Sequence, residues 1–279
     1  MLVKLYATDE ISGRLFLQSC NLDIDAILTS EEKGTFYDCL FAMMHKISAT
    51  KYHLKNYIKI EKQLFAQARN QFKKNPNQTR EAFELIFELE GFLFQIKSSL
   101  DMLVKLLIPI LGNNVVRTQT YGRKGESLIK GLDQLKNKRG VNVTAIDDLI
   151  QLIQQDKDCW LARIVDIRDK LNHVQGLRNY LFAPIRLPNG EIAVKKPKIV
   201  DIETVPFMHL IYSNNLEFHQ DFMSVALSVR APSGLLLVNV KPEDMKAKFN
   251  CETGEYVKFG WGLNVSVPEK IVQQNGDNS

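Results

Sequence analysis

Two long stretches of the chain repeat apolar residues at helical spacing. The first opens on Thr29-Ser30-Glu31-Glu32, a capping-box pattern in which the first and fourth residues bond each other's backbone N–H at a helix start. It predicts a helix that ends near Asn75-Pro76-Asn77, with its apolar face at Phe36, Leu40, Met43, Ile47, Leu54, Ile58, Phe65, Ala68 and Phe72. A second helix is predicted from about Thr79 to Ile110, along Phe83, Ile86, Leu89, Leu93, Ile96, Leu100, Leu103 and Leu107. Because the turn between them is short, the two helices are expected to pack antiparallel.

The middle of the chain predicts three shorter helices. One covers about Glu126 to Lys136, and the next begins at a second capping pattern, Thr144 to Asp147. A third begins near Lys157 and ends before Gly176, a residue suited to the left-handed position just past a helix. Its apolar side consists of Trp160, Ile164, Ile167, Leu171 and Val174.

Beyond Pro184 the pattern changes. Two short alternating runs flank Pro188-Asn189-Gly190 and predict a β-hairpin, and helical spacing then returns from Val205 to Val229. The expected fold class is mainly α: an up-and-down helical bundle with a small β-containing C-terminal portion. The expected divisions are an N-terminal extension of β character over 1–28, a bundle over 29–182, an α+β portion over 183–270 with a long helix at 205–230, and a disordered tail over 271–279.

Composition narrows the class of protein. With 279 residues, 45% of them hydrophobic, the chain can bury a full-sized core, and its net charge of +4 is too mild to require a polyanionic partner. Four scattered cysteines without a CxxC pair predict reduced thiols, and no metal or cofactor is expected. Charged residues interrupt the first twenty positions and no apolar run reaches about 20 residues. We therefore expect a cytoplasmic protein that does not contact a membrane.

One segment near the end of a predicted helix combines an arginine, carboxylates and a histidine: Arg163 to His173. At about 100° per residue, Asp169 and His173 share a helix face, whereas Arg168 lies roughly 140° from His173. Arg168 and His173 therefore converge only if two copies of the helix meet across a two-fold axis. Such a site suits RNA, because arginine braces phosphate and histidine transfers protons to or from ribose oxygens. The alternative is a helix-end ion pair between Asp169 and His173 beside a solvated Arg168.

This segment resembles the HEPN superfamily, whose signature is an Arg, four to six residues and then a His near the end of a helix. Arg168-Asp169-Lys170-Leu171-Asn172-His173 fits the four-residue spacing, although Asp rather than the commoner Asn follows the Arg. The stretch from Phe92 to Asp101 also looks like the long helix that precedes the motif in many such proteins, and the resemblance covers roughly Thr29 to Phe182.

The resemblance implies a dimeric, metal-independent endoribonuclease, often a toxin or antiphage defence effector, that leaves a 2′,3′-cyclic phosphate. Arg168 and His173 would then be catalytic, Asp169 would orient the site, and Asn172 would support it. Asp101 is a further supporting candidate, although a simple i, i+4 partner for Lys97 or Lys105 explains it equally well.

A second feature is the basic stretch from Arg117 to Arg139. Its seven basic residues against Glu126 and Asp133 give a net charge of +5, and Tyr121 lies among them as a ring that a base could stack on. The expected RNA-binding residues are Arg117, Tyr121, Arg123, Lys124, Lys130, Lys136, Lys138 and Arg139. A solvated connecting loop is the other interpretation of this stretch.

The sequence thus leaves two functions open. The first is an RNA-cleaving enzyme that works as a homodimer, with RNA and a cognate antitoxin protein as partners. The second is a catalytically inactive HEPN-like module that binds a nucleotide, RNA or protein partner.

Overall fold

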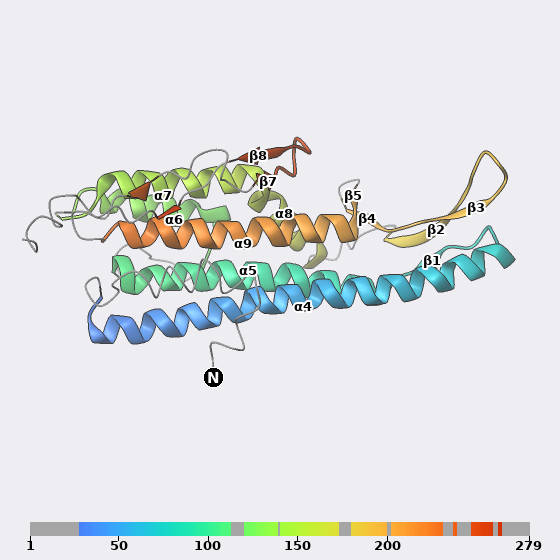
Figure 1. The fold of residues 1–279 in the computed structure, drawn as a ribbon, viewed down its shortest axis with the longest axis horizontal. Helices are drawn as coiled ribbons and strands as arrows, with labels where there is room; N and C mark the ends of the chain where they lie inside the picture. Colours follow the sequence, from blue (N-terminus) through green and yellow to red (C-terminus); the bar gives the residue numbers. More distant parts are fainter. Residues whose placement is uncertain are drawn as a thin grey trace, which may run out of the picture.

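The computed structural model describes residues 28–112, 120–138, 140–172, 180–199, 202–230, 237–238, 247–258 and 262–263. These residues form a mainly helical protein with a few short antiparallel strands, as the sequence predicts (Figure 1). The predicted N-terminal extension, apart from Leu28, and the predicted tail lie outside the described residues.

Helices α4 (Ser30–Lys74) and α5 (Phe83–Leu111) form the long antiparallel pair (Figure 1). The predicted capping box is present, because Thr29 N donates to Glu32 Oε2 at 2.8 Å and Glu32 N donates to Thr29 Oγ1 at 3.3 Å. Helix α5 begins four residues later than expected, after the short strand β1 (Arg80–Glu81). Phe83 is 55% exposed, so the buried stripe of α5 begins at Leu85 instead.

The next helices are α6 (Glu126–Leu135), α7 (Val143–Asp156) and α8 (Ala162–Asn172). The N-cap of α7 is Asn142, whose Oδ1 accepts from Ala145 N at 3.2 Å, and not the predicted Thr144. A π turn, η2 (Lys157–Leu161), joins α7 to α8 without a break in the helical backbone. The two helices expected on either side of Lys157 are therefore one continuous helical segment.

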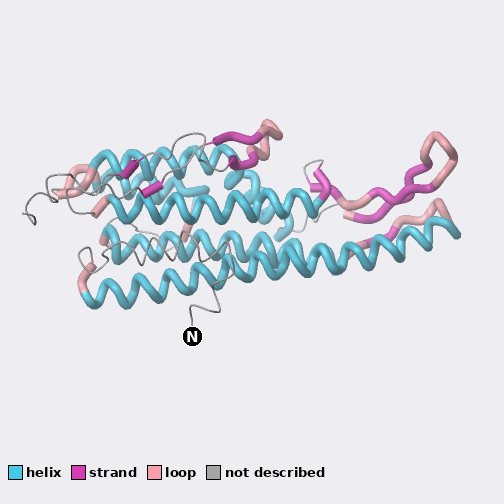
Figure 2. The backbone as a smooth tube through the Cα atoms, viewed as in Figure 1, coloured by secondary structure: helices cyan, strands magenta, loops and turns pink. Residues whose placement is uncertain are grey.

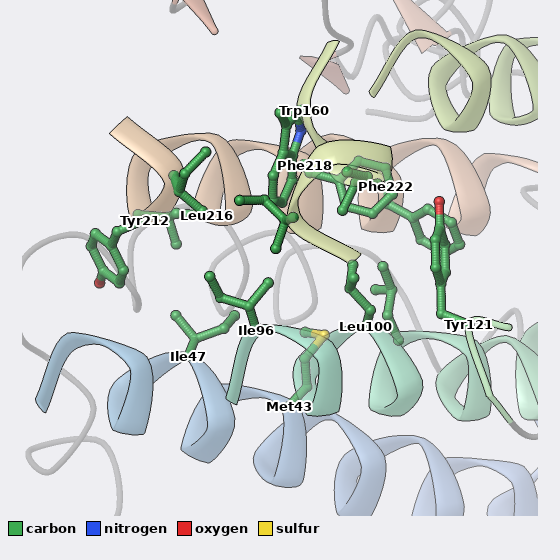
Figure 3. Close-up of a cluster of buried hydrophobic side chains, with 14 of the residues drawn as sticks. Met43, Ile47, Ile96, Leu100, Tyr121, Trp160, Tyr212, Leu216, Phe218 and Phe222 are labelled. Atoms are coloured by element: carbon green, nitrogen blue, oxygen red, sulfur yellow. The ribbon is translucent and has the colours of Figure 1, made fainter. Parts of the chain in front are cut away.

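Helix α9 (Thr204–Ser228) lies against α4, α5 and α7, and all of its residues from 214 to its end are buried. Phe218 and Phe222 of α9 meet Trp160 and the side chains of α4 and α5 in one hydrophobic core (Figure 3). The predicted long helix at 205–230 is thus confirmed, but it belongs to the bundle. The expected boundary at residue 183 does not separate two cores.

A three-stranded antiparallel sheet extends from the bundle, in the order β1, β2 (Leu181–Arg186), β3 (Ile192–Lys195). The β2–β3 pair is the predicted hairpin, with Pro184 opposite Val194 and Gly190 in the left-handed region at φ +83°. The remaining strands pair in twos: β4 (Lys198–Ile199) with β5 (Ile202–Glu203), β6 (Leu237–Val238) with β9 (Gly262–Leu263), and β7 (Ala247–Phe249) with β8 (Tyr256–Lys258).

The bundle narrows where α9 begins. There the buried hydroxyl of Tyr180 bonds Tyr57 of α4 and donates to Thr204 Oγ1, the latter at 2.8 Å. Beyond this level α4 continues past the N-terminal end of α9, and strands β1, β2 and β3 lie beside this part of α4 (Figures 1 and 2). We call this projection, formed by residues 59–84 and 181–198, the arm.

Candidate active site

Helix α8 holds the arginine of the predicted motif. Its apolar residues Ile164, Ile167 and Leu171 are buried, and the helix packs against α5. Arg168 flanks this buried face, four residues after Ile164 and three before Leu171, and 26% of its side chain is exposed. The helix therefore holds the backbone of Arg168 firmly while its side chain reaches solvent.

The side chain of Asp169 binds that of Arg168. Arg168 Nε donates to Asp169 Oδ1 at 2.9 Å, and Nη2 donates to the same oxygen. The resemblance implies that Asp169 orients His173, whereas here it holds the guanidinium of its own neighbour. His173 and the side chain of Asn172 lie outside the described residues, so the expected Asp169–His173 contact stays a prediction.

Asp101 on α5 is used locally. It forms an i, i+4 ion pair with Lys97, which is one of the two simple partners that the sequence offers. Its Oδ1 also accepts from the backbone N–H of Tyr121 at 2.7 Å. Asp101 thereby fixes the segment that leads into α6, which is a structural role.

The basic stretch before α7 is only partly available to a ligand. Lys124 lies 2.8 Å from Asp166 of α8, and Lys136 lies 2.9 and 2.6 Å from Asp133 and Asp147. The hydrogen bonds that Lys136 donates to these two carboxylates raise its pKa. Lys130 and Lys138 are exposed, whereas Arg117, Arg139 and the side chain of Arg123 lie outside the described residues.

Tyr121, expected to stack on an RNA base, is instead a core residue. It is 1% exposed, and its ring meets Phe218 edge to face at a centroid distance of 6.3 Å (Figure 3). Burial raises the pKa of its hydroxyl. Gly125, in the left-handed region at φ +87°, leaves room for this ring, because a Cβ there would lie 2.8 Å from the Tyr121 hydroxyl oxygen. The sequence prediction for Tyr121 is therefore wrong.

A buried charge cluster, which the sequence did not indicate, lies between the bundle and strand β7. Lys248 Nζ lies 2.9 Å from Asp156 and 3.1 Å from Asp221, and all three side chains are at most 4% exposed. Trp160 Nε1 donates to Asp156 at 2.6 Å. Burial raises the pKa of Asp156 to about 6; burial alone would lower the pKa of Lys248, but the two carboxylates outweigh it and raise that pKa. Because the cluster is closed to solvent, it serves packing and not substrate binding.

Two further features bear on the chemistry. Across the ranges that the structure describes, no three His, Cys, Asp or Glu side chains gather as a metal site would require. None of the described helices has the length and apolar character needed to cross a bilayer.

The site therefore comprises Arg168 held by Asp169 near the end of the helical segment α7–η2–α8; Asp166, which pairs with Lys124, lies two residues earlier in α8. A partly exposed guanidinium in a fixed position can bind a phosphate or another oxyanion. No family model, curated protein or solved structure matches this chain.

Proposed function

We propose that the protein is a metal-independent endoribonuclease with a composite site at a dimer interface. The observation that supports this proposal is the Arg168–Asp169 pair, which fixes a partly exposed guanidinium five residues before His173, the expected histidine of the site. Both Arg168 hydrogen bonds to Asp169 come from Nε and Nη2. The Nη1 hydrogens therefore remain directed away from Asp169 and are suited to a phosphate.

The chemistry follows from these groups. His173 of one protomer removes the proton from a ribose 2′-hydroxyl, whose oxygen attacks the adjacent phosphorus. The bond from phosphorus to the 5′-oxygen breaks, giving a 2′,3′-cyclic phosphate and a 5′-hydroxyl that takes up one proton. Arg168 of the other protomer stabilises the negative charge that develops on the phosphorane oxygens. The dimer is needed because five helical residues separate the two side chains by roughly 140° within one chain.

A second candidate function is RNA binding without cleavage. Asp169 occupies two of the N–H groups of Arg168, and its negative charge lies beside the position that a phosphate would take. The Arg168–Asp169 pair therefore also favours a protein that binds RNA at another part of its surface and does not cleave it.

Cleavage of RNA in the presence of EDTA tests the two candidates. The purified protein is expected to cut total RNA and to leave 2′,3′-cyclic phosphate ends. Arg168→Ala should lower the rate by about two to three orders of magnitude, and Arg168→Lys should not restore it. His173→Ala should lower it by about two to four orders of magnitude.

Lys170→Ala is the matched control, because Lys170 is an exposed cation on the same helix. It should retain the rate of the unmodified protein, and all four variants should keep its melting temperature. If Arg168→Ala and His173→Ala cleave as fast as the unmodified protein, the catalytic assignment is wrong.

A further inference from the structure

The arm carries a concentrated positive charge. Residues 59–84 and 181–198 contain ten basic residues and four acidic ones, a net charge of +6, whereas the whole chain carries +4. The remainder of the chain is therefore slightly acidic. Because the arm is made from two segments about 100 residues apart, its charge becomes visible only in the folded chain.

Along α4 the cations line one side of the helix. At 100° per residue, Lys62, Arg69 and Lys73 fall within about 40° of one another. They are about 10 and 6 Å apart along the axis, at 1.5 Å per residue. All three are exposed, on the side away from the buried Leu64, Ala68 and Phe72. The distal part of α4 thus presents a straight row of positive charge to solvent.

The same row continues toward the bundle through Lys59 and Lys55. Its inner end reaches a cavity of about 280 Å³ between α4 and α9, which Lys51, Lys55 and His209 help to line. From Lys55 to Lys73 the row is about 27 Å long.

Strands β2, β3 and β4 add cations to the same projection. Arg186, Lys195 and Lys198 are exposed, and strand β3 packs along α4. Phe182 of β2 meets Phe65 of α4 at a centroid distance of 6.4 Å, which fixes the sheet on the helix. The positive charges of both elements therefore hold a fixed spacing.

Few of these cations take part in holding the arm together. Lys196 lies 3.1 Å from the buried Glu61, and Arg80 donates to Gln67 and Gln71, so these two have structural contacts. The other eight form no ion pair with any residue that the structure describes: Lys59, Lys62, Arg69, Lys73, Lys74, Arg186, Lys195 and Lys198. Clustered like charges without partners repel one another, and a polyanion would relieve that repulsion.

The neighbouring uncharged side chains indicate which polyanion fits. Between the cations of α4 the exposed residues are polar or small, such as Gln63, Ala66, Gln67 and Asn70. Membrane-surface helices instead place Trp, Phe or Leu beside their basic residues. From Lys59 to Lys74 no large apolar side chain is exposed; the exposed apolar side chains of the arm, Phe83, Ile185 and Leu187, lie on α5, β2 and the hairpin turn, outside the stretch of α4 that carries the row. Amide groups and cations in a row are suited to phosphate and sugar oxygens of a nucleic acid backbone.

We infer that the arm is a binding surface for the phosphate backbone of a nucleic acid, and that RNA lies along Lys62, Arg69 and Lys73. The choice of RNA over DNA rests on the proposed function, while the choice of a nucleic acid rests on the arm itself. Binding through phosphates is largely independent of sequence and weakens steeply with salt.

Binding is tested separately from cleavage with a fluorescent 2′-O-methyl RNA stem–loop, which lacks the 2′-hydroxyl nucleophile. The variant Lys62→Gln/Arg69→Gln/Lys73→Gln should weaken binding by roughly 10- to 100-fold in moderate salt. The slope of log Kd against log salt should fall by about 2 to 3. A comparison variant, Lys130→Gln/Lys136→Gln/Lys138→Gln, removes the same charge from the basic stretch of the bundle, the rival RNA surface that the sequence predicts, and it should lose less affinity than the arm variant.

Three results would contradict either the inference about the arm or the proposed function. If the comparison variant loses affinity and the arm variant does not, RNA binds the bundle and the inference is wrong. The inference also fails if the arm variant loses binding to phosphatidylserine vesicles but keeps its affinity for RNA. Should Arg168→Ala bind the stem–loop normally while no form of the protein cleaves RNA, the proposed function fails and the arm remains a nucleic acid surface.

Discussion

The interior of the bundle and the arm both carry lysine side chains, but under opposite conditions. Lys248 is 1% exposed and lies between Asp156 and Asp221, so its charge is matched inside the core. Lys62, Lys73 and Lys195 are exposed and lack ion pairs with other described residues. Lys248 is part of what holds the chain together, whereas these three lysines of the arm have no such role and are available to a ligand.

The greatest loss of stability is expected when the buried lysine of the bundle is replaced. Lys248→Met leaves Asp156 and Asp221 buried without their cation, which should lower the free energy of unfolding by about 3–5 kcal/mol. Lys62→Met on the arm is the control and should change it by less than about 0.5 kcal/mol. Urea denaturation at pH 7 measures both. Equal losses in the two variants would show that the contrast between the regions is false.

A second test uses the buried His219 in the middle of α9. It is 0% exposed, its Nδ1 donates to the Asn215 carbonyl at 2.7 Å, and burial lowers its pKa to about 4. Above pH 6.5 the histidine is neutral in both the folded and unfolded states, so its full contribution to stability is present. As the pH falls from about 6.5 toward 4, only the unfolded chain takes up the proton, and stability is lost.

This histidine should therefore lower the free energy of unfolding by about 2 kcal/mol between pH 7 and pH 5. His219→Gln removes that part of the pH dependence, and the difference between the two proteins isolates it from other groups, including Asp156. Denaturation at both pH values provides the measurement. An identical pH dependence in both proteins would mean that His219 does not titrate as described.

A smaller effect is expected at the start of α4. Thr29→Ala removes the side-chain half of the capping box with Glu32 and should lower the free energy of unfolding by about 1 kcal/mol. Thr35→Ala is the matched control, because Thr35 is exposed within the same helix. A loss of the same size in the control would indicate that the cap does not stabilise the helix.

Replacing the cations of the arm should hardly change the stability of the protein. The variant Lys62→Gln/Arg69→Gln/Lys73→Gln should shift the free energy of unfolding by less than about 0.5 kcal/mol, because these side chains stabilise nothing in the described fold. Denaturation in low salt is the appropriate measurement, since mutual repulsion is then strongest. A loss of several kcal/mol would mean that the cations support the arm itself.

Features fixed by neighbours along the chain could be predicted from the sequence. The capping box at Thr29, the turn at Pro188-Asn189-Gly190 and the helical spacing in α9 all depend on residues within a few positions of one another. The structure confirms each of these. Local patterns fail where local signals compete, as at Asn142, which caps α7 in place of Thr144.

Features that depend on distant residues could not be predicted in this way. Arg80 pairs with Phe182, and Lys248 meets Asp156, although about 100 and 92 residues separate them. Tyr121 lies in a polar, basic stretch, yet Phe218 and Asp101 hold it in the core. For the candidate site, the sequence predicted a helix at Arg168, and the structure has one there, but the sequence did not indicate that Asp169 would bind the guanidinium.

The π turn between α7 and α8 determines where the helical segment can lose a residue without changing its register. A π turn closes its hydrogen bond over one residue more than an α turn, as Ala162 N does with the Lys157 carbonyl. Removing the exposed Asp158 would convert it to an α turn and leave both flanking helix faces in register, whereas removing Gln154 would rotate every later residue by about 100°. The carbonyl of Cys159 in this turn accepts from Cys251 N at 2.8 Å, so the widened turn also anchors the segment after β7. The direction in which Arg168 points is thus set by a single extra residue about ten positions upstream.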